Sequence, residues 1–521
     1  MALSTLDLIV FFTYCIGIIA LGLYVSREKK GHEKTANDYF LAGNTLTWWA
    51  VGSSLIASNI SAEQIVGMSG SGYAIGLGIA TYELMAAATL ILVAKFFLPI
   101  FLEKKIYTMP QFLEMRFDNR VRTTLAVFWI LVYIFVNLTS VLYLGSLALT
   151  RVAGVDMTYA IIGLALFSAL YSLYGGLMAV AWTDVVQVIV LVFGGILTSI
   201  FALDAVSGGQ GWIAGLQELY AQAPDRFDMI LDREHPYYKD LPGISVLIGG
   251  MWIVNLSYWG FNQYITQRAL AAKSLKEAQK GVMFAAYLKL FMPFIVVIPG
   301  IAAFVLEADI DKNDEAYPWL LTTFMPSGLL GLSFAALIAA IVSSLSSMMN
   351  SVSTIFTVDI YRQFINRNAS EHRLVATGRI VSAVSLVIAV IVAPQLSTLD
   401  QAFQFIQNFT GLVSPGVFTI FLFGMFWKKA TANAALWAAI LTIPFGFALE
   451  LLVPGLPFID RMGLVFLLLS LLIITISLIE GKGDDPKSIE LRKGMFTTGT
   501  KFNIGAIGVC AILVVVYYVF W

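Results

Sequence analysis

Polar residues interrupt a long apolar stretch in the segment ASNISAEQ, residues 57–64. Five of the eight are polar: Ser58, Asn59, Ser61, Glu63 and Gln64. Such groups are costly in hydrocarbon unless partners satisfy them. A second interruption of the same kind, NLSYWGFNQ, occupies residues 255–263. Unwound backbone carbonyls and neutral side chains at such interruptions are suited to binding a small cation and a polar solute.

The composition of the chain indicates that these polar groups lie within a membrane. Of 521 residues, 59% are hydrophobic and 12% are charged, whereas about 25% are charged in soluble domains. Apolar runs long enough to cross a bilayer recur from end to end, which is typical of a polytopic helical membrane protein. The net charge of -1 gives no support to a nucleic-acid partner. Cys15 and Cys510 lie in apolar runs and offer neither a disulfide framework nor a metal site.

The apolar runs predict about fourteen membrane-spanning helices, so the elements that position the polar segments are transmembrane. The first run lacks the basic start of a signal peptide and is interpreted as a helix of the mature protein. An even number of spans puts both termini on one side of the membrane. The expected spans are 4–26, 47–72, 76–102, 121–150, 155–175, 179–205, 245–266, 280–306, 318–361, 376–393, 398–427, 430–452, 460–480 and 500–521.

The distribution of positive charge predicts which side that is. When residues at the span ends are counted with the neighbouring loop, 24 of the 32 Lys and Arg residues fall in alternate loops beginning with the loop after the first span, 6 fall in the other loops, and 2 lie deep within spans. Cytoplasmic loops carry the excess of positive charge. We therefore expect both termini outside, an external loop at 206–244, and an integral protein of the plasma (inner) membrane.

The interruptions also predict how the chain is organised. Spans two to six and seven to eleven form two groups of five, which must be inverted relative to each other, and each group begins with an interrupted span. We therefore divide the chain into an extra helix with an inner loop, a five-helix repeat, the external loop, a second five-helix repeat and three extra helices. These units are residues 1–46, 47–205, 206–244, 245–427 and 428–521.

Several long stretches resemble the sodium/solute symporter family, and most closely its bacterial sodium/galactose members. The resemblance runs over nearly the whole chain. It implies a LeuT-like all-α fold of inverted five-helix repeats with extra terminal helices, working by alternating access. The stretches are NISAEQ (59–64), GMSGSGY (67–73), FVNLTSVLYLG (135–145), YGGLMAVAWTDVVQ (174–187), NLSYWGFNQYITQR (255–268), AALIAAIVSSLSSMMNS (335–351) and FTGLVSPG (409–416).

The resemblance implies a sodium site between the first interruption and the SSLSS run. A hard monovalent cation prefers neutral oxygens, which unwound carbonyls and hydroxyls supply. The alternative for the run is helix packing, with serines bonding back to their own helix, and we favour it for Ser346 and Ser347. The implied ligands are the carbonyls of Ala57, Ile60 and Ala340 and the hydroxyls of Ser343 and Ser344.

The resemblance also implies a sugar site. Sugar hydroxyls need many donors and acceptors, and the apolar face of the ring needs an aromatic partner. Glu83 and Lys289 could also form a salt bridge with each other, which is compatible with solute binding, and Asn137 and Gln407 alone could be ordinary hydrogen bonds between helices. The implied residues are Gln64, Glu83, Asn137, Asn255, Lys289 and Gln407, with Tyr258 stacking on the ring.

The remaining implied positions concern gating and specificity. Met68, Tyr82 and Phe403 resemble an outer lid, and Tyr258 backed by Trp259 resembles an inner one; plain packing is the alternative for a lone Met or Phe. Asp184 resembles an acid on the sodium exit path, and its alternative is a residue near a helix start. Two positions depart from the galactose carriers: Ala86 stands where a Ser is expected, and Ser257 where a Tyr is expected.

The function expected from these observations is sodium-coupled symport of a neutral hexose, galactose or glucose, with sodium as the co-transported ion and the lipid bilayer as surroundings. Alternatives are symport of another solute, such as myo-inositol, an amino acid or a sialic acid, and a sodium-selective leak or channel. When the span ends are counted with the loops, no Arg lies within an expected span, which disfavours an anionic substrate. The sequence contains no set of residues that suggests an enzyme.

Overall fold

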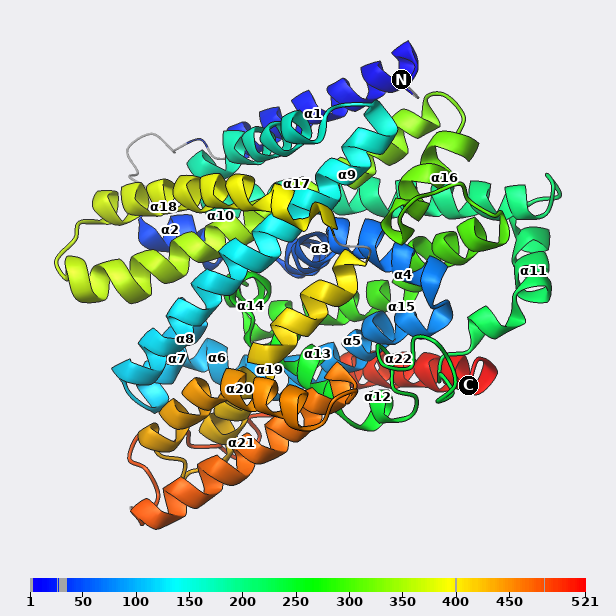
Figure 1. The fold of residues 1–521 in the computed structure, drawn as a ribbon. Helices are drawn as coiled ribbons and strands as arrows, with labels where there is room; N and C mark the ends of the chain where they lie inside the picture. The colour runs from blue at the N-terminus through cyan, green and yellow to red at the C-terminus, as the bar shows by residue number, and fades with distance from the viewer. Residues whose placement is uncertain (1–2, 26, 28–34, 399–400, 482) are drawn as a thin grey trace.

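The computed structural model describes residues 3–25, 27, 35–398, 401–481 and 483–521, and this part of the chain is built almost entirely from helices (Figure 1). Within it, eleven helical stretches are long and apolar enough to cross a membrane. Their burial differs widely: 89% of the most apolar window is buried in residues 329–365, but only 6% in residues 500–519. The first of these stretches is therefore central, and the second presents its apolar side chains outward, as a lipid-facing helix does.

The first half of the chain supplies the helices on one side of the polar cavity described below. Three π-helical segments, η2 (Glu63–Met68), η4 (Val93–Phe97) and η5 (Tyr133–Leu138), connect successive α-helices in the same direction. The α-helices are α1 (Thr5–Val25), α2 (Ala36–Leu41), α3 (Trp48–Asn59), α4 (Ser69–Ala74), α5 (Thr81–Leu92), α6 (Leu98–Lys104), α7 (Met109–Arg116), α8 (Asn119–Val132), α9 (Thr139–Ala153), α10 (Met157–Val206) and α11 (Trp212–Gln222).

The second half supplies the helices that complete the cavity and the peripheral helices at the C-terminus. The π-helical segment η8 (Phe356–Ile365) continues α17. The helices are α12 (Ser245–Ile248), α13 (Gly250–Phe261), α14 (Gln263–Leu270), α15 (Leu275–Val305), α16 (Ala316–Phe324), α17 (Leu329–Ile355), α18 (Glu371–Val392), α19 (Ala402–Phe426), α20 (Ala432–Leu452), α21 (Phe458–Glu480) and α22 (Thr500–Val519).

The helix expected to be interrupted at residues 57–64 is broken there. Ile60, which follows the last residue of α3, has φ -76° and ψ 98°, so the helical hydrogen bonding cannot continue. The Ser61 hydroxyl accepts the amide of Glu63 at 3.0 Å, and the Gln64 side-chain oxygen accepts the amide of Ser61 at 3.1 Å. The polar residues of this segment therefore satisfy amide groups that the break releases.

The second expected interruption is also a break. Asn262, with φ -74° and ψ 124°, separates α13 from α14. Its side-chain oxygen accepts the Tyr133 hydroxyl at 2.6 Å, and the amide of Gln263 donates to the same hydroxyl at 2.9 Å. Tyr133 belongs to η5, so a side chain from the first half of the chain holds the break in the second half.

A sharp bend divides α10 into two helical parts. Gly176 has φ 65° and ψ -156°, a conformation that an L side chain rarely adopts. A Cβ at this position would also lie 2.5 Å from the carbonyl oxygen of Tyr39. The bend falls between the expected spans 155–175 and 179–205, where the sequence predicts a boundary.

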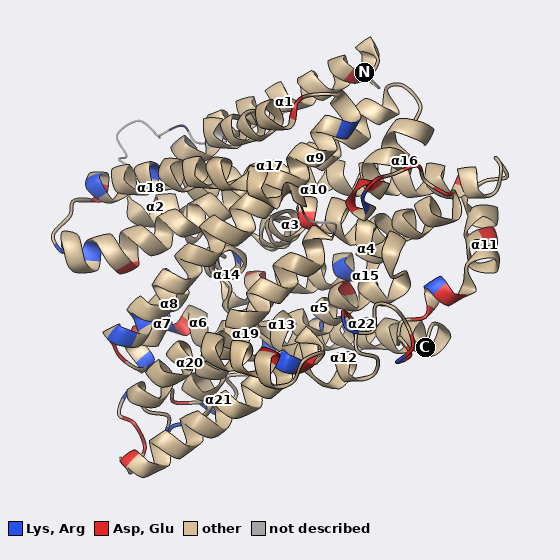
Figure 2. Cartoon of the chain, in the orientation of Figure 1, with Lys and Arg blue, Asp and Glu red and all other residues tan. Residues whose placement is uncertain are grey.

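The helices pack around α17, which contacts α10 along its length and also packs against α3 and α9. In Figure 1, α17 and α3 lie in the middle of the helical array, and α1 and α21 lie at its edges. Figure 2 shows that the positions of Lys, Arg, Asp and Glu lie mainly in loops and at helix ends, with few across the middle of the array. This pattern is the one that a bilayer requires, because a charge is costly at its centre.

Candidate functional site

All seven residues predicted to bind the solute line one cavity, although they come from six elements. The residues of the two predicted lids, Met68, Tyr82, Phe403, Tyr258 and Trp259, line it too. The contributors are η2 with Gln64, α5 with Glu83, η5 with Asn137, α13 with Asn255 and Tyr258, α15 with Lys289, and α19 with Gln407. The break after α3 and the π-helical turns of η2 and η5 thus bring polar side chains to one place.

Glu83 and Lys289 form an ion pair across the cavity wall. The ammonium of Lys289 lies 2.5 Å from a carboxylate oxygen of Glu83, and both side chains are almost fully buried. The same ammonium lies 5.2 Å from the centre of the Trp259 ring, within the range of a cation–π contact. The salt bridge expected as one alternative is therefore present. Lys289 has further N–H donors, and its role in solute binding stays a prediction.

Two predicted amide side chains use part of their hydrogen-bonding capacity on the protein. The Gln64 side-chain oxygen accepts the amide and the hydroxyl of Ser61, at 3.1 and 3.0 Å. The Asn255 side-chain nitrogen donates to the carbonyl of Met251 at 3.1 Å. As oriented, Gln64 can therefore offer the cavity its NH₂ group as a donor, and Asn255 can offer its oxygen as an acceptor.

The Tyr258 hydroxyl is already engaged with the protein. It accepts the side-chain amide of Asn59 at 2.9 Å, and it lies 2.6 Å from the hydroxyl of Tyr264. Its ring stands edge-on to that of Trp259, with centroids 5.2 Å apart. The ring therefore faces the cavity, and the hydroxyl links α13 to the break after α3.

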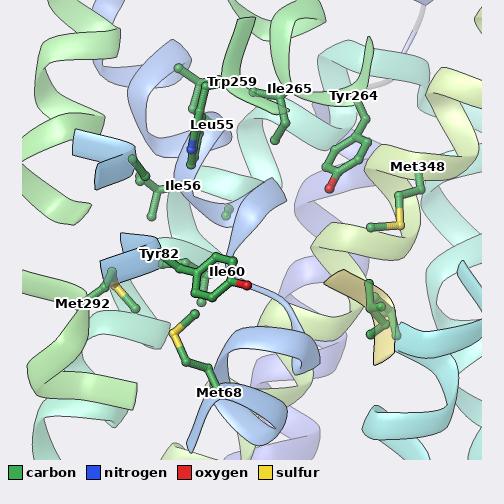
Figure 3. Close-up of a cluster of buried hydrophobic side chains, with 14 of the residues drawn as sticks. Leu55, Ile56, Ile60, Met68, Tyr82, Trp259, Tyr264, Ile265, Met292 and Met348 are labelled. Atoms are coloured by element: carbon green, nitrogen blue, oxygen red, sulfur yellow. The ribbon is translucent and has the colours of Figure 1, made fainter. Parts of the chain in front are cut away.

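The three residues of the predicted outer lid are buried and lie close together. Tyr82 and Phe403 make an edge-to-face contact with centroids 5.2 Å apart, and Met68 and Phe403 are almost completely buried. Figure 3 shows Met68 and Tyr82 in one buried cluster with Ile60 and Met292. Phe403 also lies over Gly67, where a Cβ would be 3.1 Å from the Cβ of Phe403. Buried side chains in contact with one another therefore line this side of the cavity.

The residues predicted to hold sodium lie on α17 and at the end of α3, two helices that are in contact. Ala57, Ile60, Ala340, Ser343 and Ser344 are all fully buried. The Ser344 hydroxyl donates to the carbonyl of Ser58 at 3.1 Å, which joins the two helices at the break. The arrangement supplies neutral oxygens from two helices, as a monovalent cation requires. Ser347 and Ser346 bond other hydroxyls, those of Ser58 at 2.9 Å and Ser168 at 3.0 Å.

Asp184 lies beside these residues rather than at a helix start. It follows the Gly176 bend by two turns of α10 and is fully buried. Because the helix dipole stabilises an acid mainly in the first turn, the helix-start alternative has little support. Its two carboxylate oxygens accept the hydroxyls of Ser343 and Ser54, each at 2.5 Å. Asp184 therefore orients one of the predicted sodium ligands directly.

The expectation that no Arg lies within a span is wrong. The helix after the second break continues to Leu270, past the expected end at residue 266, and contains Arg268, which is fully buried. Its guanidinium donates to the hydroxyls of Ser54 at 3.3 Å and Ser347 at 2.5 Å, and to the carbonyl of Tyr264 at 2.7 Å. Arg268 does not line the solute cavity. It therefore supplies no ligand for an anionic solute.

Sequence reasoning left several cavity residues without a role in the solute site. Asn59 and Glu63 line the cavity, and each has a buried side-chain oxygen with no hydrogen-bond partner. Both belong to the polar run that drew attention to the break, which was the available signal. Ala86 and Ser257, the two departures from the galactose carriers, also line the cavity.

Comparisons with known proteins agree with this geometry. The model of the sodium:solute symporter family matches residues 39–442. A sodium/glucose cotransporter of Vibrio parahaemolyticus is 53% identical, covering 100% of this chain and 99% of the relative. The sodium/myo-inositol cotransporter 2 of Oryctolagus cuniculus is 35% identical, covering 85% of this chain and 69% of the relative.

Two solved structures have the same fold. A Na⁺-coupled sialic acid symporter, in a substrate-bound outward-open state, superposes with a TM-score of 0.80 and 26% identity, covering 91% of this chain and 98% of that one. A nucleobase–cation symporter superposes with a TM-score of 0.56 and 14% identity, covering 88% and 98%. Both are LeuT-fold transporters, so the chain has the LeuT-like all-α fold.

Proposed function

The chain belongs to the sodium:solute symporter family, and from this premise we propose that it carries a neutral hexose, galactose or glucose, into the cell together with sodium. The observation that carries the proposal is the cavity: apart from Glu63, its polar side chains are uncharged or, in Glu83 and Lys289, paired with each other, and the Tyr258 ring lines it as well. A neutral polyhydroxy solute satisfies such groups without leaving a charge unpaired. The relative named as a sodium/glucose cotransporter supports the same substrate class.

Sodium would bind where α3 breaks, against α17. The proposed ligands are the carbonyls of Ala57, Ile60 and Ala340 and the hydroxyls of Ser343 and Ser344, with Asp184 along the exit path. The meeting of these residues between two helices supports the proposal. A cation shared by α3 and α17 would stabilise one arrangement of the break, and in this way favour the binding of the solute at the adjoining η2.

The proposed membrane arrangement has fourteen spans in the plasma (inner) membrane, with both termini outside. Eleven of these spans are the long apolar stretches. The other three are the two broken helices, α3–α4 and α13–α14, and the first part of α10. The repeats at 47–205 and 245–427 each begin with a broken helix. In Figure 1 both ends of the chain lie at the right-hand side of the helical array, which fits an even number of spans.

Transport would proceed by alternating access. The burial of Met68, Tyr82 and Phe403 supports an outer lid closed over the cavity, and the Asn59–Tyr258 bond supports an inner lid at Tyr258 and Trp259 that opens with the break. A membrane potential of about 100 mV contributes roughly 2.3 kcal/mol per charge, and a tenfold sodium gradient roughly 1.4 kcal/mol. One sodium could therefore drive accumulation of about several hundredfold.

A cyclic polyol such as myo-inositol is the second candidate solute. It presents the same hydroxyl pattern to the same neutral cavity, and relatives named as sodium/myo-inositol cotransporters support it. These relatives share 35% of aligned residues, against 53% for the glucose cotransporter, so hexose remains the first choice.

Uptake of labelled galactose into liposomes containing the purified protein tests the function. We expect an inward sodium gradient to drive uptake, a matched potassium gradient to fail, and unlabelled glucose to compete better than myo-inositol. Gln64→Ala should abolish galactose uptake while sodium still stabilises the protein thermally, because the break keeps its carbonyls. Sodium-driven uptake of myo-inositol but not of galactose would contradict the hexose proposal. A sodium current without a saturable dependence on sugar would indicate a channel.

A further inference from the structure

Glu63 is a buried carboxyl group that neither the sodium site nor the predicted solute site uses. It is the first residue of η2, directly after the break, and its side chain lines the cavity. Only 6% of the residue is exposed, and one of its carboxyl oxygens has no hydrogen-bond partner in the protein. A buried polar atom without a partner costs free energy that a ligand in the cavity could recover.

In the part of the chain that the structure describes, no neighbouring cation is available to the Glu63 carboxyl. Lys289 is the single Lys or Arg among the described residues that line the cavity, and it is paired with Glu83 at 2.5 Å. The guanidinium of Arg268 is bonded to Ser54, Ser347 and Tyr264 and lies outside the cavity lining. The protein therefore offers Glu63 no cation, which separates it from an ordinary structural ion pair.

The neighbour of Glu63 complements it. Gln64 uses its side-chain oxygen on Ser61 at 3.0 and 3.1 Å, so its NH₂ group is the part available to the cavity. Glu63 offers an oxygen, which accepts hydrogen bonds in either protonation state. Adjacent positions of η2 thus present an acceptor and a donor to the same cavity, and neighbouring hydroxyls of a polyol can satisfy both.

We propose that the Glu63 carboxyl is a further substrate-binding group, which accepts a hydrogen bond from one hydroxyl of the transported polyol while Gln64 donates to a neighbouring hydroxyl. This inference rests on the proposed function and deepens it. It assigns the solute a pair of adjacent hydroxyls as the feature recognised at the broken helix. Because Glu63 lies on the helix whose break holds the proposed sodium ligands, the contact also joins the solute to the element that binds the ion.

The test is a scan of monodeoxy hexoses as competitors of labelled galactose uptake, in wild type, Glu63→Ala and Glu63→Gln. In the wild type, loss of the hydroxyl whose hydrogen bond Glu63 accepts should weaken competition by about tenfold, because a buried acceptor is left without a partner. In Glu63→Ala the galactose KM should rise by about tenfold, and the same deoxy sugar should compete as well as the parent, because the partner is gone. Glu63→Gln, which keeps the shape and an acceptor oxygen, should fall between them.

A structural role for Glu63 predicts a different outcome. In that case Glu63→Ala would raise the sodium half-saturation constant together with the galactose KM, and each deoxy sugar would lose as much competition as it does in the wild type. We expect instead that the sodium constant stays within about twofold of the wild-type value. Ser140→Ala is the control, since Ser140 is buried, lies outside the cavity lining and donates its hydroxyl to the carbonyl of Val136 at 2.5 Å, and it should leave KM unchanged. If Glu63→Ala does not fold, Glu63→Gln carries the same scan.

Two results would overturn the inference. One is a galactose KM in Glu63→Ala within about twofold of the wild type. The other is a loss of competition that is the same in Glu63→Ala as in the wild type for every deoxy sugar. The wild-type arm separates this failure from that of the proposed function. A wild type without sodium-driven hexose uptake refutes the function, while normal wild-type uptake with an unaffected variant refutes only the role of Glu63.

Discussion

At the scale of single residues, Ser344 gives the sharpest test of the sodium site. Its hydroxyl reaches the Ser58 carbonyl across the contact between α17 and α3. We expect Ser344→Ala to raise the sodium half-saturation constant of galactose uptake by about tenfold or more, because a neutral ligand is lost, with the galactose KM little changed at saturating sodium. Ser353→Ala is the control, since Ser353 lies on the same helix with a buried hydroxyl that has no partner. Equal sodium constants in the two variants would remove Ser344 from the ligand set.

The Tyr258 side chain allows its ring and its hydroxyl to be separated. The hydroxyl is bound by Asn59 and Tyr264, so the ring is the part free to contact the solute. Tyr258→Phe should therefore change the galactose KM by no more than about threefold, whereas Tyr258→Ala, which removes the stacking surface, should raise it by about tenfold or more. Competition assays on both variants measure this. A large effect of the Phe substitution on KM would place the hydroxyl on the sugar.

At the scale of helices, the bend in α10 depends on one glycine. Gly176→Ala would place a Cβ 2.5 Å from the Tyr39 carbonyl at a positive φ, a strain of about 1–3 kcal/mol. Its thermal unfolding midpoint in detergent should fall clearly below that of the wild type. Gly163→Ala, in the same helix with open space around it, should not lower the midpoint. Similar midpoints for the two variants would mean that the bend tolerates a side chain.

The elements show how far sequence alone could go. The breaks at Ile60 and Asn262 were predictable, because polar residues in an apolar run must satisfy backbone groups that a break releases. The end of α14 was not predictable. A charged residue such as Arg268 suggests a loop, and only the structure shows that Ser54, Ser347 and Tyr264 bond it. The free oxygen of Glu63 was equally hidden, since it depends on where Lys289 and Glu83 pair. Tertiary partners decide such positions, and the local sequence does not contain them.

At the scale of the whole molecule, the orientation in the membrane can be tested by labelling. The Lys and Arg bias of 24 to 6 between alternate sets of loops favours both termini outside, since positive charge is retained in the cytoplasm. That orientation makes the loop after α10 external and the loop after α21 cytoplasmic. Gln210 and Asp484 are exposed positions in these two loops.

Replacing Cys15 and Cys510, the two cysteines of the chain, provides a background in which Gln210→Cys and Asp484→Cys can be labelled singly. A membrane-impermeant maleimide should label position 210 in intact cells, but position 484 only after lysis, because the bilayer shields the cytoplasmic loop from the reagent. Retained sodium-driven galactose uptake by each variant is the control for folding. Labelling at 484 but not at 210 in intact cells would invert the orientation, and the lid of Met68, Tyr82 and Phe403 would then face the cytoplasm. Labelling at both positions would instead require an even number of spans between them, and one of the seven expected there would have to be withdrawn.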